Sequence, residues 1–452
     1  MTAPSGPVLF NSSTGNDSTA SGLGPATAVI GSSAELDGTS TVDLSYDGMD
    51  LSGISAGDLL FCDTTSGRKF SIIASVDTTN ETITTDDAWG TESGVSWAVG
   101  GKRQYLFNSS YRTEFADAMQ TGWAVNLESG YTETHNGSGI GFNTGDLRSS
   151  TSQTLTTITG DASSPATFVS IINSFATHFN FDGSSGVEFR NCSFAAYRGT
   201  SAGGTNEIQG CVKCANYGIM RNCTFLAQRT YDTYAICQAN TSSVLIDCLS
   251  MLEDNSSYKY TKASGFGGRS YTLINCKVKN TKYGASYQSY SGAGTSRFLK
   301  CQFDSLHGVA SGGNQYNSEM TVIGCIFKLQ SGGIAWNISY SSWSYGMTAP
   351  QTFQGNVVTA DGDAFTVIQS TNAGRFANSL WSYGNAIHNG TYDSSFPAGQ
   401  NIDDNTTDPE ITGDLATGNF VIGSQTVIDH VGLSPGVSGG GSSGSTFHPL
   451  AQ

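Results

Sequence analysis

Six cysteines recur at intervals of 24 to 31 residues in the middle of this chain. Thiols in such a series could form disulfides, bind a metal ion or carry redox chemistry. Two of them stand in nearly the same context, FRNCSF at 189–194 and MRNCTF at 220–225. Two later repeats carry Asn at the same place, with no paired loss of a second thiol. We therefore interpret the position as a structural ladder that fills a bend, formed by Cys192, Cys223, Cys248, Cys276, Cys301, Cys325, Asn356 and Asn385.

The other uses of these thiols fit the pattern less well. Strands stacked about 4.8 Å apart would admit a disulfide, but stacked side chains point the same way. A ladder also spreads its sulfurs along an axis, whereas metal ligands converge on one ion. CVKC at 211–214 resembles a redox or zinc half-site without a partner pair, and Cys214 and Cys237 precede ladder cysteines by nine and eleven residues. We predict a second short stack there, ten free thiols in all, no metal site and no cofactor.

Acidic residues within the repeats could cleave a glycan, because that chemistry generally uses two carboxylates. Glu253 and Asp254 follow one ladder position by five and six residues, and Asp361 and Asp363 follow another by five and seven. The two pairs lie four repeats apart, about 19 Å at the spacing of parallel strands, so they cannot act on one bond. We expect Asp254 to pair with Lys282 instead. Asp361 and Asp363 remain the catalytic candidates, although a turn is the favoured use of this Asp-Gly-Asp.

Three stretches place Tyr and Trp among small polar residues, at 258–271, 283–298 and 336–347. Aromatic side chains on loops or outward strands can stack on sugar rings or become buried against a neighbouring subunit. The subunit interface is slightly favoured, and a host glycan is the other interpretation. The candidate contact residues are Trp336, Trp343, Tyr345, Tyr287 and Tyr290.

A repeated strand, bend and strand must carry these residues. Units such as VEFRNCSF (187–194), YTLINCKV (271–278) and TVIGCIF (321–327) alternate apolar residues up to the ladder position. An apolar residue then usually follows two places later, as two strands with inward apolar faces require. The mean period is about 28 residues with variable gaps, there is no Leu-x-x-Leu-x-Leu spacing and no helix separates the units. This pattern favours a β-helix over a leucine-rich horseshoe.

The segments that flank the repeats have other patterns. TSG and TTNE interrupt alternating runs near the start and predict hairpin turns of a small β module. At 109–123, Phe115, Ala118 and Met119 share one helical face after a Ser cap, which predicts a short capping helix. The expected domains are a β module at 1–104, the capping helix and its connection at 105–122, a β-helix at 123–400, a closing β segment at 401–431 and a Gly/Ser-rich extended tail at 432–452.

The composition disfavours several classes of partner. A net charge of −16 with only 21 Lys and Arg opposes a phosphate backbone, so we expect neither nucleic acid nor anionic membrane as a partner. Charged residues make up 13% of the chain and 56 residues are Gly, so the composition suits strands and tight turns. The first twenty residues have no basic stretch before an apolar run, and eighteen apolar residues never occur together. We expect no signal peptide and no membrane insertion.

The pattern apolar-x-Asn-Cys-x-apolar at this spacing resembles the right-handed parallel β-helices of the pectate-lyase type. With a small N-terminal module ending in WAVGGKR (97–103) and a short helix, the chain resembles the surface proteins of tailed bacteriophages: tail spikes, tail fibres and head decorations. The resemblance implies an all-β fold, namely a right-handed single-stranded parallel β-helix preceded by a small N-terminal β module.

The same resemblance implies a function as well as a fold. It implies a non-catalytic structural protein of the virion, made in the host cytoplasm and exposed on the particle surface. A homotrimer, contacts with other virion proteins through the termini and binding of a host surface glycan are the implied partners. The alternative on the same fold is a polysaccharide lyase or glycoside hydrolase that depolymerises the glycan.

Overall fold

Nearly all the regular elements in the described part of the chain are β-strands. Its only helix, α2 (Gln425–Val431), has seven residues, and no helix in this part is long and apolar enough to cross a membrane. The predicted helix at 109–123 lies outside the described residues. The computed structural model describes residues 8–11, 29–56, 58–100, 106, 124–127, 129–137, 140–141, 156–172, 177–181, 186–198, 209–228, 235–240, 242–254, 256, 258–268, 270–288, 294–312, 319–338, 351–361, 365–370, 380–391 and 407–431.

The chain divides into two compact units. The first comprises Met1–His135, Phe142–Val169 and Gly183–Ser193, and the second comprises Asn136–Gly141, Ser170–Asp182 and Phe194–Gln452. The first unit contains a small barrel and the first strands of the β-helix. The second contains most of the coils and the closing segment.

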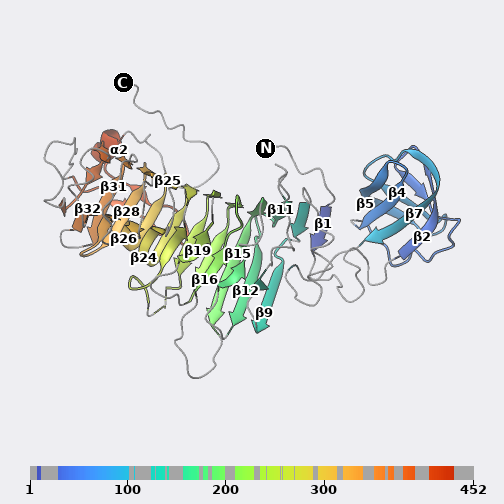
Figure 1. Ribbon diagram of the computed structural model, residues 1–452, viewed down its shortest axis with the longest axis horizontal. Coiled ribbons are helices and arrows are strands. Elements are labelled where there is room, and N and C mark those ends of the chain that lie inside the picture. The colour runs from blue at the N-terminus through green and yellow to red at the C-terminus, as the bar shows by residue number, and fades with distance from the viewer. Residues whose placement is uncertain are drawn as a thin grey trace. The chain divides into compact units, whose positions relative to one another are not determined.

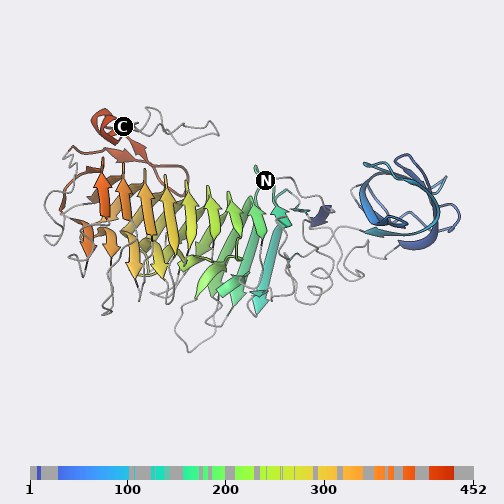
Figure 2. The same cartoon turned by 45° about the horizontal axis from the view of Figure 1, so that its top comes forward.

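Six antiparallel strands of the first unit close into a barrel, seen end-on in Figure 2. The predicted turns at TSG and TTNE do connect hairpins, β4 to β5 and β5 to β6. Val42, Leu60 and Val99 are fully buried at its centre, and Trp97 Nε1 donates to Asp47 Oδ2 at 2.6 Å. In barrel order the strands are β2 (Val29–Asp37), β3 (Thr41–Asp43), β6 (Thr82–Thr85), β5 (Gly67–Asp77), β4 (Leu59–Thr64) and β7 (Thr91–Gly100).

The first strand of the chain does not belong to this barrel. β1 (Val8–Asn11) pairs in parallel with β8 (Ala124–Leu127), which pairs with β11 (Thr156–Thr159). The barrel is therefore inserted in the sequence between two neighbouring strands of the β-helix. The predicted β module at 1–104 did not separate β1 from the barrel. A strand of four residues carries too little periodicity to show which sheet it joins.

Two rows of short parallel strands form the coils, which Figure 1 shows side by side. The predicted fold class, all-β with a parallel β-helix after a small β module, is confirmed. The first row contains β1, β8, β11 and β14 (Val187–Arg190) in the first unit, and in the second unit β17 (Ile219–Arg221), β20 (Ser243–Ile246), β23 (Tyr271–Ile274), β25 (Thr295–Leu299), β27 (Glu319–Ile323), β30 (Gln351–Gln354) and β33 (Leu380–Tyr383). The second row contains β9 (Thr132–Gly137), β10 (Ile140–Gly141), β12 (Ala166–Ile172), β13 (Thr177–Asn180), β15 (Cys192–Arg198), β16 (Gly210–Lys213), β18 (Thr224–Ala227), β19 (Ala235–Ala239), β21 (Leu249–Leu252), β22 (Ser264–Gly268), β24 (Lys277–Gln288), β26 (Gln302–Gly312), β28 (Ile326–Gln330), β29 (Ile334–Ile338), β31 (Val357–Asp361), β32 (Phe365–Ser370), β34 (Ala386–Ile387) and β35 (Gly390–Thr391).

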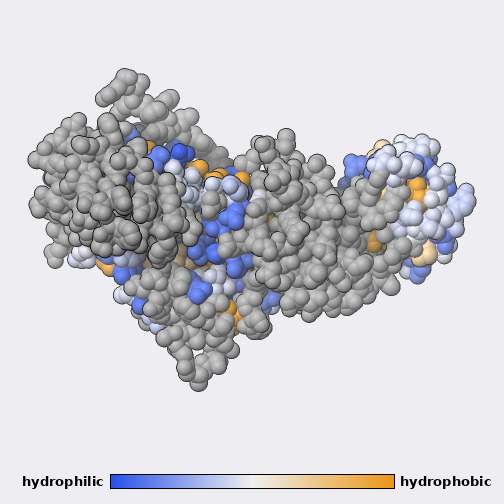
Figure 3. Space-filling view, viewed as in Figure 1, coloured by the Kyte–Doolittle hydropathy of each residue, from blue (hydrophilic) through white to orange (hydrophobic). Residues whose placement is uncertain are grey.

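The parallel register stacks apolar side chains of successive coils on one another. Phe298, Val322 and Phe353 are register partners before the bend, and all three are fully buried. After the bend, Phe303 and Phe327 are partners with ring centroids 5.0 Å apart. Burial of each such side chain contributes about 1.5–3 kcal/mol, so these aligned stacks stabilise the coils. The outer surface differs, and over β15, β16 and β19 it is mainly hydrophilic in the view of Figure 3.

The bend itself is a single left-handed residue. The residue before each ladder position has φ between 51° and 65°, a region that Gly adopts freely and Asn and Asp tolerate. Lys300 has neither advantage. These bend residues are Asn191, Asn222, Asp247, Asn275, Lys300, Gly324, Gly355 and Gly384.

The closing segment packs against the last coils, as Figures 1 and 2 show for α2. Within the described residues 407–431 of the expected β segment, a two-stranded sheet of β36 (Ile411–Thr412) and β37 (Val421–Ile422) precedes α2. Phe420 N also donates to Gln302 Oε1 at 2.7 Å. The contact is apolar because each of these coils offers an apolar residue directly after its ladder position. The resulting cluster contains Ile326, Val357, Ala386, Leu415, Phe420, Val427 and Val431.

Candidate functional site

Five ladder side chains make the same hydrogen bond, whether they are Cys or Asn. Cys248, Cys276 and Cys325 donate Sγ–H to the carbonyl three residues before the ladder position of the preceding coil, at 3.3–3.4 Å. Asn356 and Asn385 donate Nδ2–H to the equivalent carbonyls at 3.1 and 3.0 Å. A shared acceptor explains why an amide can replace a thiol here.

The thiols are buried and poorly suited to chemistry. None of the ten cysteines, all of which are described, forms a disulfide, and burial raises the pKa of Cys237, Cys248 and Cys301, which disfavours the reactive thiolate. Cys214 and Cys237 are stacked with 3.7 Å between their sulfurs. Within the described ranges, no three His, Cys, Asp or Glu residues are grouped so that they could hold a metal ion. The ladder is part of the core.

A partly exposed carboxyl on β26 has the properties of a functional group. Tyr260 Oη donates to Asp304 Oδ1 at 2.8 Å. Burial raises the pKa of Asp304, and the Tyr260 hydrogen bond and nearby lysines lower it only in part. Burial also raises the pKa of Tyr260, as does the neighbouring Asp304 charge. Asp304 therefore keeps its proton more readily than an ordinary aspartic acid.

Asp304 belongs to a row of charges that crosses three coils. Lys279 on β24 and Lys328 on β28 are its register partners on either side. Each of the three residues is the third after the ladder position of its coil. Opposite charges at directly paired positions attract one another, so this row is locally favourable.

The backbone beside this row is irregular. The pairing of β24 with β26 shifts register between Lys279 and Thr281, which leaves Asn280 as an extra residue with φ 66°. Tyr260 and Ala263, in the loop before β22 and at its end, have φ 60° and 62°. Tyr260 N donates to Asn280 O at 3.0 Å. Bulges and left-handed non-glycine residues of this kind concentrate at functional sites.

Lys279 joins two carboxylates from distant parts of the sequence. Its Nζ lies 3.1 Å from Asp254 Oδ1 and 2.9 Å from Asp414 Oδ1, which comes from the closing segment. Hydrogen bonds from Asn280 and then Lys279 lower the pKa of Asp254. The Ala416 amide and then Lys279 lower the pKa of Asp414. Both acids are therefore ionised at neutral pH.

Asp254 was expected to pair with Lys282, but in the structure it pairs with Lys279. Lys282 Nζ lies 5.2 Å from the centroid of the Tyr283 ring. The cause is the bulge at Asn280. Lys279 precedes the bulge and lies in the charged row, whereas Lys282 follows the bulge and lies outside that row.

The predicted acids occupy different positions around this row. Lys328 Nζ lies 3.8 Å from Asp361 Oδ1, at the end of β31. Glu253 instead hydrogen-bonds Tyr197 and contributes to raising the pKa of that phenol after burial. Asp363 lies outside the described residues, so its pairing with Asp361 stays a prediction. We define the Asp304 site as Asp254, Lys259, Tyr260, Lys279, Asn280, Asp304, Lys328, Asp361 and Asp414.

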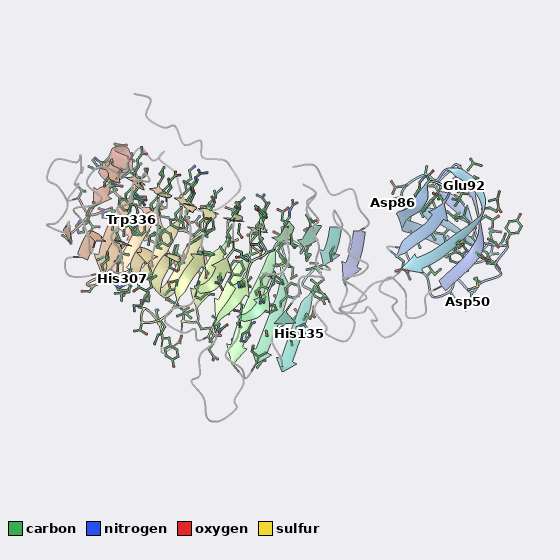
Figure 4. All side chains as sticks on the ribbon, viewed as in Figure 1. Asp50, Asp86, Glu92, His135, His307 and Trp336 are labelled. Atoms are coloured by element: carbon green, nitrogen blue, oxygen red, sulfur yellow. The ribbon has the colours of Figure 1, made fainter. Side chains whose placement is uncertain are left out.

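Trp336 was predicted to lie on an aromatic surface, but its side chain is fully buried. Its strand position is the register partner of Val309 inside the coil. Its ring packs 5.7 Å from that of Phe353, so Trp336 cannot contact a glycan or a subunit, and the prediction is wrong for this residue. Figure 4 shows Trp336 and His307 on the yellow and orange coils. Of the other candidates, Tyr287 is described only in its backbone, and Tyr290, Trp343 and Tyr345 lie outside the described residues.

Asp304, Tyr260 and Lys279 were not among the predicted site residues. A signal for two of them was available, since counting three residues from consecutive ladder positions gives Lys279, Asp304 and Lys328. The predicted acids stand instead at positions five to seven after their ladder residues. Tyr260 could not be found by counting, because its place depends on a loop between β21 and β22.

A second polar cluster lies in the first unit. Glu133 is fully buried and accepts hydrogen bonds from Leu106 N and Tyr131 Oη, both at 2.9 Å. Its other oxygen contacts His135 Nε2, on β9 in Figure 4. Since the carboxylate is enclosed by these partners, its effect is to fix the start of β9.

Comparison with known proteins finds distant structural similarity to solved structures. No protein-family model and no curated protein sequence matches the chain. The structure of pectate lyase Pel9A aligns with a TM-score of 0.44 and 11% identity over 75% of this chain and 83% of that one. The tailspike protein gp49 from Pseudomonas phage LKA1 aligns with a TM-score of 0.27 and 10% identity, over 82% and 63% respectively. The catalytic unit of a thermostable GH87 alpha-1,3-glucanase from Streptomyces thermodiastaticus strain HF3-3 gives 0.35 and 10%, over 85% and 90%. The neighbours thus include a phage tailspike and polysaccharide-degrading enzymes, and at these identities the likeness concerns the fold alone.

Proposed function

We propose that this chain is a surface protein of a tailed bacteriophage and that its β-helix binds a host-surface polysaccharide at the Asp304 site. The sequence resemblance to virion surface proteins supports the first part, together with the barrel and β-helix that the structure contains. In this proposal the chain is a homotrimer that contacts other virion proteins through its termini. It is a tail spike, a tail fibre or a head decoration.

The observation that carries glycan binding is the charged row on β24, β26 and β28. Charged residues are only 13% of the chain, yet four carboxylates and three lysines gather at the Asp304 site. Carboxylates, ammonium groups and a phenol supply the donors and acceptors that sugar hydroxyls require. Four of these residues, Lys279, Asp304, Lys328 and Asp361, sit on paired strands, which hold them in place before a ligand arrives.

A second function, depolymerase activity, is favoured by the surroundings of Asp304, whose Oδ1 accepts a hydrogen bond from Tyr260 Oη at 2.8 Å and whose pKa is raised by burial. A carboxyl that keeps its proton can donate it to the glycosidic oxygen as the bond to the anomeric carbon breaks. A second carboxylate would take a proton from the water that attacks that carbon. Asp361, which contacts Lys328 in the same row, is the candidate for this base.

One experiment separates binding from cleavage. Purified full chain is incubated with capsular polysaccharide or lipopolysaccharide of the host, and retention and new reducing or unsaturated ends are both measured. Retention without new ends, reduced about tenfold or more by Asp304→Asn or Tyr260→Phe, supports a binding protein. New ends that disappear in Asp304→Asn establish the depolymerase. Asp50→Asn, on the barrel, is the charge-matched control, and retention equal in all four proteins contradicts the site.

The virion part of the proposal has its own test. Antibody labelling of intact phage particles, viewed by electron microscopy, is expected to mark either the tail or the head surface. Light scattering of the purified chain is expected to give three times the mass of one chain. Particles without label contradict a place on the virion surface.

A further inference from the structure

Each lysine of the Asp304 site already has a carboxylate partner. Lys279 Nζ lies 2.9 Å from Asp414 and 3.1 Å from Asp254. Lys328 lies 3.8 Å from Asp361, and Lys259 lies 4.0 Å from Asp254. A carboxylate or sulfate on an incoming sugar would therefore have to displace an existing ion pair before it could bind a lysine.

The acids are more accessible than the central lysine. The side chains of Asp254, Asp361 and Asp414 are 62%, 57% and 52% exposed, whereas those of Lys279, Lys328 and Lys259 are 8%, 32% and 36% exposed. An approaching ligand therefore meets more carboxylate than ammonium surface. These oxygens accept hydrogen bonds from sugar hydroxyls and repel anionic groups.

The charged groups of the site do not favour an anion. Four carboxyl groups, those of Asp254, Asp304, Asp361 and Asp414, stand against three lysines. The Tyr260 hydroxyl adds a neutral group with both donor and acceptor capacity. Beyond the site, the net charge of −16 adds a general repulsion toward polyanions.

We propose that the Asp304 site takes an uncharged, hydroxyl-rich polysaccharide and rejects polysaccharides that carry uronate, sialate or sulfate groups. The inference rests on the proposed function, since it names the substrate class of the same site. The observation that supports it is that each lysine is paired with a carboxylate and that these carboxylates are more exposed than the lysines.

The test is an array of purified bacterial capsular polysaccharides and O-antigens, divided into uncharged and uronate- or sialate-containing members. The wild-type full chain is expected to retain uncharged members and to bind anionic members at least about tenfold more weakly at low salt. Retention of anionic members with equal or greater affinity overturns the substrate class. Retention of no member overturns the proposed function itself, so the two failures are distinguishable.

Two variants test the mechanism of rejection. Asp361→Asn removes the ion-pair partner of Lys328, and Asp414→Asn leaves Lys279 with Asp254 as its remaining partner. Binding of anionic members is therefore expected to rise about tenfold in each variant. Asp50→Asn changes the net charge equally but lies on the barrel, and it is expected to leave anionic binding unchanged. An equal rise in all three variants would show that net charge alone excludes polyanions, which contradicts the site-based inference. Circular dichroism confirms that each variant is folded before binding is compared.

Discussion

Replacing Asn356 with Leu is expected to remove the hydrogen bonds of the ladder at one coil. Asn356 is fully buried, its Oδ1 accepts from Cys325 N–H at 2.9 Å, and its Nδ2 donates to Val322 O at 3.1 Å. Leu has a similar volume but can replace neither hydrogen bond. A buried polar group that loses its partner costs about 1–3 kcal/mol, so two such groups give a loss of about 2–6 kcal/mol.

Amide hydrogen exchange measures this loss at the affected group. A loss of about 3 kcal/mol corresponds to roughly 150-fold faster exchange of the Cys325 amide. Cys325→Val is the matched control, because it removes only a weak thiol donor to Phe298 O and keeps both Asn356 bonds. We expect it to cost about 1 kcal/mol, or roughly fivefold in exchange. If Asn356→Leu accelerates exchange no more than this control does, the hydrogen-bonding account of the ladder is refuted.

Three further outcomes are expected. Lys300→Asn relieves a left-handed lysine and should stabilise the chain by about 0.5–1 kcal/mol, seen as a higher urea midpoint; an unchanged or lower midpoint counts against this. Burial lowers the pKa of His178 to about 4, so as pH falls from about 6.5 to 4 the unfolded state takes the proton first and stability drops by up to about 3 kcal/mol. His178→Leu should remove that part of the pH dependence in urea unfolding, and an identical pH profile would contradict it. Lys279→Met breaks the ion pair to Asp414 and should speed amide exchange at 411–422 by about tenfold, whereas unchanged exchange would show that apolar contacts alone hold the closing segment.

The coils could be predicted from the sequence because the residues that define them recur periodically. Alternating apolar residues and a recurrent Cys or Asn mark each strand and its bend, and the register of a parallel stack follows from that repetition. The left-handed residue before each ladder position was also visible as Asn, Asp or Gly, but Lys300 interrupts the series. The predicted module at 1–104 includes β1, which pairs with β8 of the coils, because a four-residue strand has no period of its own to show which sheet it joins.

The candidate site was harder to predict because it depends on departures from the repeat. The bulge at Asn280 moves Lys282 out of the charged row, and Tyr260 reaches Asp304 from a loop. Asp414 comes from a segment 135 residues beyond Lys279 in the chain. Trp336 was misplaced because it begins a stretch rich in Ser and aromatic residues (336–346), whereas its strand position points into the coil. Periodicity contains none of this information.

The central claim is that the outward row around Asp304 is where polysaccharide binds. Amide exchange of the full chain, with and without the polysaccharide it retains best, tests this claim most directly. We expect protection at 258–263 and at 302–306, with little change in the barrel at 29–100. Protection confined to the barrel, or uniform across the coils without any excess at these two segments, would contradict the account.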